Sequence, residues 1–343
     1  MMKACVLKDV STFEVKEVER PTLVEDDEVL LKVTACSICG SDLEMRKNPA
    51  YIGRIFGHEL CGVVEDPGKS TRLKKGDRII MNTGAKRRGC PGVRTDGGYA
   101  EYVLVEEDDC LPMPENISDH IGSLLEPLAI GYGIAEMADI QPGDKVLITG
   151  CGIIASMVAR WAKYRGASYI AMTEISEVKI AKAEEIGTPA QFFHAADPDL
   201  VDKLLAASDG GFDKAVDCPG NAATLNLTLD VTRPLGIIVE AAIHYKPVEF
   251  NYLKLVMKRL TLRGFYLSSP YFKEVSRIMS EEAPFDPTVF VSEEIDIDGI
   301  PDAVERLSAP DSDLLKVVIH PYPLSLIYSI RKPSNLRCAA VCH

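Results

Sequence analysis

The chain has 343 residues, of which 46% are hydrophobic and 26% are charged, and its formal net charge is −13. This length exceeds the usual size of a single core, so two domains are expected, and the composition is that of a globular protein. The excess of acidic residues would repel a phosphate backbone, which argues against binding nucleic acid through a basic surface. We therefore expect a globular protein that acts on a small molecule.

Neither a secretion signal nor a membrane span is predicted. Charged residues interrupt the apolar N-terminus, Met1 to Val10, and the longest apolar stretch, Val146 to Ala159, contains two glycines and is too short to cross a bilayer. The ten cysteines are scattered along the chain rather than arranged as a disulfide framework. We expect reduced thiols and a cytoplasmic protein.

The first part of the chain has the pattern of β-strands. Between residues 3 and about 105, alternating runs such as Val29 to Thr34 and Ala100 to Val105 are separated by Gly, Pro and Asp turns. Beyond Pro114 the apolar residues take helical spacing, from Ile121 to Ile134. A β-rich region is therefore followed by a helix.

Strands and helices then alternate. Strands are predicted at 145–149, 168–172, 213–217 and 237–241, and helices at 153–165 and 176–186. Such alternation predicts a parallel, doubly wound α/β sheet. A last apolar strand at 316–319 is placed to return to the first domain.

A glycine motif marks a dinucleotide site. Gly150, Gly152 and Ala155 form G-x-G-x-x-A directly after a predicted strand and at the start of a helix that opens with Ile153 and Ile154. Gly150 permits the tight turn, and Gly152 lets the backbone approach a pyrophosphate at the helix N-terminus. A plain glycine turn in an α/β domain is the alternative.

An acidic residue indicates which dinucleotide binds. Glu174 lies 24 residues after Gly150, where a carboxylate accepts hydrogen bonds from the adenosine ribose hydroxyls and repels a 2′-phosphate. No arginine follows closely to accommodate that phosphate, and Lys179 is assigned to the same cofactor-binding set. We expect NAD rather than NADP.

Four residues supply the side chains that zinc prefers. Cys39, His58, Glu59 and Glu126 provide a thiolate, an imidazole and two carboxylates in chain order. Taken singly, a cysteine is usually a core residue and a histidine usually makes structural hydrogen bonds. Their combination favours a metal site.

Around these residues the chain resembles the zinc-containing medium-chain dehydrogenases, in particular the sorbitol, threonine and butanediol dehydrogenase branch. The motifs that carry the resemblance are I-C-G-S-D at 38–42, G-H-E at 57–59, D-G-G-x-A-E-Y at 96–102 and E-P-L at 126–128. The resemblance covers residues 3 to 321. It implies a Rossmann doubly wound sheet together with a β-rich GroES-like catalytic domain.

The implied domains are a GroES-like catalytic domain at 1–125, an NAD-binding Rossmann domain at 126–264 and a return to the catalytic domain at 265–321. Residues 322–343 contain three basic residues, Arg331, Lys332 and Arg337, and two cysteines near the end, but no acidic residue. We expect an appended C-terminal extension, either partly ordered or a partner-docking segment.

The resemblance also assigns chemical roles. Cys39 and His58 would be zinc ligands, Glu59 a further ligand or its close alternate, and Glu126 a carboxylate that approaches the metal when water or substrate exchanges. Zinc would act as a Lewis acid that lowers the pKa of a bound alcohol, so that hydride can pass to the nicotinamide.

Ser41 matches the hydroxyl residue that takes the alcohol proton and relays it outward. The family often has a histidine where this chain has Glu44, so Glu44 either replaces that relay group or is simply solvated.

A structural zinc is not expected. Relatives often hold one in a four-cysteine lobe, whereas residues 81–96 contain only Cys90 and the basic triplet at 86–88. The triplet is interpreted as a solvated loop, with contact to an acidic substrate as the alternative. Cys36 and Cys39 have C-x-x-C spacing, but no second such pair completes a zinc ribbon, so Cys36 is expected to be a packing residue. One catalytic zinc ion per chain is therefore predicted.

The function indicated is NAD-linked oxidation of a secondary alcohol in a polyol, diol or amino alcohol to a ketone, or the reverse reduction. The alternatives are a zinc-free NAD(P)-dependent enoyl or quinone reductase and a non-catalytic dinucleotide-binding sensor. His244, after a predicted strand, either reaches the nicotinamide or is a loop residue without a catalytic role. By resemblance, a homodimer or homotetramer is expected.

Overall fold

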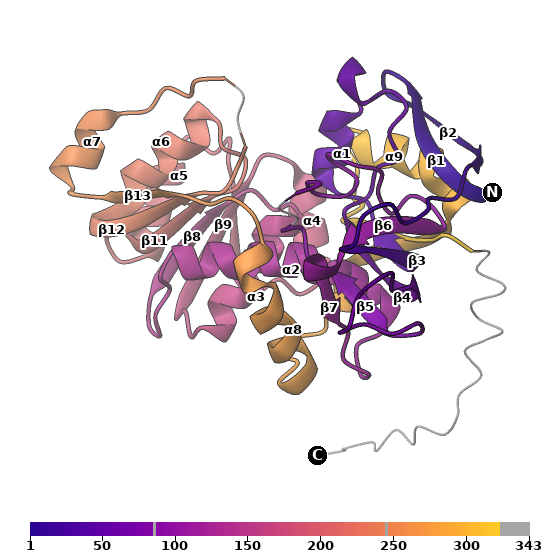
Figure 1. The fold of residues 1–343 in the computed structure, drawn as a ribbon. Coiled ribbons are helices and arrows are strands. Elements are labelled where there is room, and N and C mark those ends of the chain that lie inside the picture. Colours follow the sequence, from indigo (N-terminus) through magenta and orange to yellow (C-terminus); the bar gives the residue numbers. More distant parts are fainter. Residues whose placement is uncertain (85–86, 244–245, 323–343) are drawn as a thin grey trace, which may run out of the picture.

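The computed structural model describes residues 1–84, 87–243 and 246–322 (Figure 1). The N-terminal half forms a two-stranded antiparallel sheet beside a larger mixed sheet. The strands of this half are β1 (Met2–Asp9), β2 (Thr12–Val18), β3 (Glu28–Ser37), β4 (Glu59–Asp66), β5 (Arg78–Met81), β6 (Tyr102–Glu106) and β7 (Cys110–Pro112). The predicted β-rich region is confirmed.

Strand β3 organises the larger sheet. It pairs antiparallel with β4, β6 and β15 (Lys316–His320), and β15 pairs parallel with β14 (Val291–Asp296). The C-terminal strand therefore returns to the first domain, as its apolar pattern predicted. Apolar side chains from β1, β3, β4 and β15 pack into one buried core with helix α9 (Ile300–Ser308).

The second half is a six-stranded parallel sheet in the order β10-β9-β8-β11-β12-β13. Its strands are β8 (Lys145–Thr149), β9 (Tyr169–Glu174), β10 (Gln191–His194), β11 (Phe212–Asp217), β12 (Thr232–Glu240) and β13 (Thr261–Gly264). Its helices are α3 (Ile153–Tyr164), α4 (Glu177–Glu185), α5 (Leu200–Ala207), α6 (Ala222–Val231) and α7 (Tyr252–Met257). The doubly wound α/β fold is confirmed, and the strand order reverses at β8, where such sheets bind ligands at their carboxyl ends.

Short or weakly patterned elements were not anticipated from the sequence. β10 and β13 have four residues each, too few to show a period, and the three helices α5 to α7 were not among the predicted elements. Strand β9 extends to Glu174, two residues beyond the predicted end, so Glu174 ends the strand rather than following it.

Helix α2 (Asp119–Met137) lies between the two sheets (Figure 1). Its buried face packs in one cluster with Ala35 and Cys61 of the first sheet and with Val146 and Trp161 of the second domain. The predicted boundary between 125 and 126 therefore falls inside a helix that packs against strands of both sheets. Helix α8 (Phe272–Glu281) contributes to the same cluster.

Five short 3-10 turns complete the described fold, at 49–51, 107–109, 269–271, 287–290 and 297–299, and a short helix α1 (Gly40–Met45) follows β3. The described helices include none that is both long and apolar enough to cross a membrane.

Tyr322, assigned to the extension, packs on the first domain, because its hydroxyl bonds to Glu101 O and its ring lies 4.5 Å from Lys32 Nζ. Residues 323–343 lie outside the described ranges.

Candidate active site

Cys39 is held at the junction of β3 and α1. The strand ends at Ser37, and the Ile38 amide donates to Val317 O of β15 at 3.1 Å. Cys39 is the N-cap of α1, and its own amide donates to Asp42 Oδ2 at 3.1 Å. The thiol is therefore fixed at the exit of one strand by hydrogen bonds to another strand and to the next helix.

Glu59 opens strand β4 and His58 directly precedes it, after a glycine that the packing requires. Gly57 has φ +96°, and a Cβ there would lie 2.5 Å from a carbon of the Tyr99 ring and 2.8 Å from Cys36 Sγ. Only glycine fits this contact, which explains the first position of the G-H-E motif. Cys36 is a buried core residue with a free thiol, as expected for packing.

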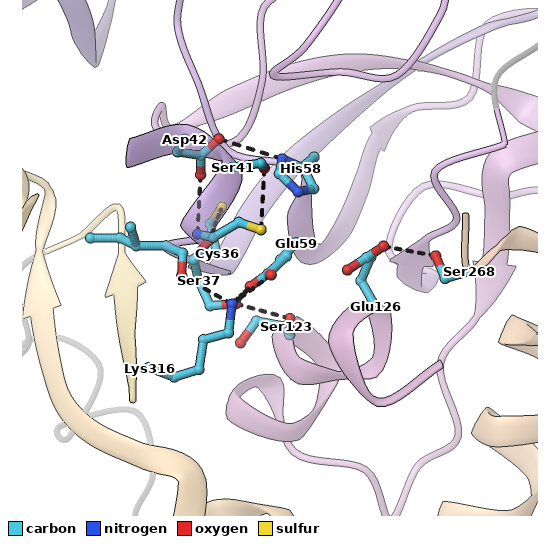
Figure 2. Close-up of polar contacts among 12 residues, drawn as sticks. Cys36, Ser37, Ser41, Asp42, His58, Glu59, Ser123, Glu126, Ser268 and Lys316 are labelled. Atoms are coloured by element: carbon cyan, nitrogen blue, oxygen red, sulfur yellow. Dashed lines mark hydrogen bonds and ion pairs between the residues drawn. The ribbon is translucent and has the colours of Figure 1, made fainter. Parts of the chain in front are cut away.

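The structure brings three of the four predicted metal ligands together, and Figure 2 labels two of these, His58 and Glu59, with the fourth, Glu126. Ligand atoms of Cys39, His58 and Glu59 all lie within 4.8 Å of one another. The His58 and Glu59 side chains are buried, and Cys39 is half-buried. One thiolate, one imidazole and one carboxylate at this spacing are a suitable donor set for zinc.

Behind His58 lies the carboxylate of Asp42, the last residue of the I-C-G-S-D motif. His58 Nδ1 is 3.5 Å from Asp42 Oδ1, and neither buried atom has a hydrogen-bond partner among the described residues. Tyr99 donates to the other oxygen of Asp42 at 2.8 Å. A histidine that directs one nitrogen to a carboxylate keeps the other for a metal. Asp42 therefore orients His58 as carboxylates commonly orient zinc-binding histidines, which adds to the fit of this site to zinc.

Charges around His58 favour its protonated form. Burial lowers the pKa of His58, but the facing Cys39 and Asp42 outweigh burial and raise the pKa of His58 well above its ordinary value. A cation in the place of that proton would meet the same negative surroundings.

Glu59 forms a buried ion pair with a lysine far away in the sequence. Lys316 Nζ lies 2.5 Å from both carboxylate oxygens and also donates to Ile38 O at 3.0 Å, while Ser37 donates to Glu59 Oε2. Burial lowers the pKa of Lys316, whereas Glu59 and Cys39 raise it, and the net direction is upward. The Glu59 carboxylate is thus already paired with a buried lysine.

Glu126 lies beside the cluster rather than in it. It comes from α2, is buried, and accepts a hydrogen bond from Ser268 at 2.7 Å, and Ser268 in turn lies 3.2 Å from the Thr83 hydroxyl. Burial raises the pKa of Glu126, against the opposing effect of His58. Sequence reasoning missed Ser268, because nothing in its local pattern distinguishes it.

The two predicted relay residues differ in position. Ser41 donates to Cys39 Sγ at 3.2 Å, so its hydroxyl touches a metal-ligand candidate. Glu44 points to solvent and pairs with Lys47 at 2.7 Å, with 71% of its side chain exposed. This placement matches the solvated alternative for Glu44.

The loop at 81–96 is partly different from the expectation. Arg87 pairs with Asp27 at the surface, but Arg88 pairs with the buried Glu28, so Arg88 is not simply solvated. Burial raises the pKa of the Cys90 thiol to about 12. Lys86 and His244 lie outside the described residues.

The dinucleotide motif has the geometry that its spacing predicted. Gly150 takes φ +84°, and Gly152 is the N-cap of α3 with open space where a Cβ would stand. Glu174 Oε2 accepts a hydrogen bond from the Cys151 amide at 3.0 Å, which holds the carboxylate against the glycine loop. Ile153 and Ile154 begin α3, and Lys179 is exposed on α4.

Comparisons with known proteins agree with this geometry. Residues 25–115 match the alcohol dehydrogenase GroES-like domain, and residues 154–281 match the zinc-binding dehydrogenase family. The chain is 32% identical over 272 residues to an uncharacterised zinc-type alcohol dehydrogenase-like protein of Escherichia coli K12, covering 69% of this chain and 76% of that protein.

Two further relatives match nearly the whole chain. Sorbitol dehydrogenase of Bacillus subtilis 168 is 26% identical over 348 residues, covering 93% of this chain and 97% of that protein. The structure of 2R,3R-butanediol dehydrogenase from Bacillus subtilis superimposes with a TM-score of 0.84 at 26% identity, covering 94% of this chain and 100% of that one.

The fold and the thiolate–imidazole–carboxylate cluster define a zinc-type oxidoreductase with a dinucleotide-binding domain. The chain belongs to the zinc-dependent alcohol dehydrogenase family. The predicted family resemblance, the fold class and the enzyme class are thereby confirmed. Zinc and a nicotinamide dinucleotide are the cofactors of this enzyme family.

Proposed function

We propose that the protein oxidises a secondary alcohol of a polyol or diol to a ketone, with NAD as the hydride acceptor. The observation that carries this proposal is the convergence of Cys39, His58 and Glu59 within 4.8 Å in a chain with a formed dinucleotide loop. The similarity to sorbitol and butanediol dehydrogenases supports a substrate with neighbouring hydroxyl groups.

The residues divide the work between holding the metal and handling the proton. Cys39 and His58 would hold one catalytic zinc, and Glu59 or Glu126 would supply a carboxylate ligand. When bound, zinc supplies a Lewis acid that polarises the substrate oxygen. Ser41, which contacts Cys39 Sγ, receives the substrate proton at its hydroxyl and passes it outward. Glu44 is not assigned a step, since it faces solvent.

Glu174 supports NAD over NADP. Its carboxylate ends β9 and accepts bonds from the Cys151, Ile175 and Ser176 amides, at 3.0, 2.7 and 3.1 Å. A negative side chain fixed at this place repels a 2′-phosphate and bonds the ribose hydroxyls. We assign Gly150 and Gly152 to the pyrophosphate.

A homo-oligomer is supported by an exposed apolar surface. Tyr252, Leu253 and Met257 of α7 are exposed by 67%, 67% and 75%, and the neighbouring β13 is an edge strand of the parallel sheet. Pairing through this side would cover both features. A cytoplasmic location is supported by the eight described cysteines, all with free thiols.

Replacing Cys39 by serine tests the proposal. Cys39→Ser should lose the catalytic zinc and at least about 100-fold in turnover, because a side chain that binds the metal directly is removed. NADH binding, measured by fluorescence, should stay within twofold of the wild type. Cys90→Ser is the matched control, since Cys90 lies outside the ligand cluster and should keep zinc and turnover. Turnover of a polyol panel by Cys39→Ser at the wild-type rate would overturn the metal mechanism.

A further inference from the structure

A second group of metal-ligand side chains lies away from the active site. His120 of α2, Glu294 of β14 and His320 of β15 place three ligand atoms within 4.8 Å of one another. Glu294 Oε2 is 2.7 Å from His320 Nε2 and 3.1 Å from His120 Nδ1. Both imidazoles therefore face the same carboxylate oxygen.

Both ring nitrogens of His320 face oxygen atoms. Nδ1 lies 3.1 Å from Thr34 O, and Nε2 lies 2.7 Å from Glu294 Oε2. A carbonyl oxygen and a carboxylate oxygen only accept, so a neutral ring with a single N–H can donate to only one of them. A metal ion between Nε2 and Glu294 would satisfy both of these atoms while Nδ1 donates to Thr34 O.

The surroundings of His320 are those of a metal ligand. The ring is 1% exposed, and its Nδ1 bonds to a backbone carbonyl, which is the usual support of a metal-ligating histidine. Two imidazoles and one carboxylate suit zinc, cobalt or nickel. Tetrahedral zinc with bonds of about 2.0 Å keeps its ligand atoms roughly 3.3 Å apart, within a few tenths of an ångström of the spacing from His120 to Glu294.

The cluster is partly open to solvent. The side chains of His120 and Glu294 are 17% and 27% exposed, so water reaches two of the three ligands. A water molecule can complete a four-coordinate shell from there.

We infer that His120, Glu294 and His320 form a second binding site for a divalent first-row transition metal ion, most suitably zinc. The site is distinct from the catalytic cluster: His320 is four residues along β15 from Lys316, roughly 13 Å, and His120 is six residues along α2 from Glu126, roughly 9 Å. It is also distinct from the four-cysteine lobe of relatives, since it contains no thiol.

This metal ion would act as a structural link. It ties the first turn of α2, the helix that packs against strands of both sheets, to two strands of the returning catalytic sheet. The ligands are separated by 174 and 26 residues in sequence, so an ion that binds only the folded state stabilises contacts between distant segments. The expectation of one zinc per chain becomes two.

Metal analysis of the full-length protein after equilibration with zinc tests the site. We expect two zinc ions per chain in the wild type, one in Cys39→Ser, one in His120→Asn and none in the double variant. His194→Asn is the matched control, because His194 also faces a glutamate, at 3.6 Å from Glu177, but belongs to neither cluster. It should keep two ions.

Cobalt distinguishes the two sites by spectroscopy. The catalytic site contains a thiolate, so its cobalt form shows a thiolate-to-metal charge-transfer band, whereas the second site has only nitrogen and oxygen ligands. Cobalt in Cys39→Ser should give visible d–d bands without that charge-transfer band. Cobalt in His120→Asn should keep the charge-transfer band of the catalytic site and lose the d–d bands of the second site.

Thermal stability gives a readout that is independent of activity. Zinc at about 100 times its Kd should raise the Tm of Cys39→Ser by about 4 °C and leave that of the double variant unchanged. The proposal is overturned if Cys39→Ser binds no zinc, or if the double variant binds as much as Cys39→Ser. His120 is partly exposed, so its replacement tests the site without disturbing the buried His320.

Discussion

Replacing Lys316 by methionine removes the positive partner of a carboxylate that has almost no access to solvent. Lys316 and Glu59 are each 1% exposed, and the ammonium lies 2.5 Å from the carboxylate. Methionine keeps the length and most of the volume of the lysine stem, so the main consequence is an unpaired buried charge rather than a cavity.

The magnitude follows from that unpaired charge. Removing one partner of a buried ion pair destabilises a protein by about 3–5 kcal/mol, because the remaining ion stays desolvated. Replacing both partners leaves no ion, so the double variant Glu59→Gln/Lys316→Met should lose clearly less stability than Lys316→Met alone. The difference between the two measures the penalty on Glu59.

Urea denaturation of chelator-treated protein, followed by circular dichroism, measures these free energies without a metal to neutralise Glu59. Lys8→Met is the matched control, since Lys8 and Glu14 form an exposed pair at 2.8 Å whose loss should have little effect. A loss below about 1 kcal/mol for Lys316→Met, or a double variant as unstable as the single one, would refute this reasoning.

Two other changes test features outside the metal cluster. Burial and Asp217 raise the pKa of Glu240 to about 7, so the folded state keeps its proton while the unfolded state loses it, and stability falls as pH rises from about 4.5 to 7. Glu240→Gln should remove this fall, worth about 1 kcal/mol after allowance for partial exposure, in urea midpoints of cofactor-free protein at pH 5 and 8. Equal pH profiles would contradict the assignment. Leu235 takes φ +67°, which lies in the left-handed region that favours glycine. Leu235→Gly should therefore stabilise by about 0.5 kcal/mol, whereas Leu253→Gly in α7 should destabilise; a loss of stability in Leu235→Gly would count against backbone strain.

Local patterns predicted the fold and the kind of site. The glycine motif and the acidic Glu174 depend on one turn and one strand end, so their spacing along the chain determines their geometry. Cys39, His58 and Glu59 each lie at the end of a strand or the start of another, and their types indicated zinc before their positions were known. The β-rich half and the alternating half followed from hydrophobic periodicity.

Contacts between distant segments were decided only by the tertiary structure. Lys316 meets Glu59 across 257 residues, and Ser268 meets Glu126 across 142, because the chain returns to its first sheet after completing the second. No local sequence pattern specifies which distant residues will meet when the chain returns. The same return brings His320 to His120, so the second histidine cluster is a product of the fold, whereas the catalytic ligands were visible in the sequence.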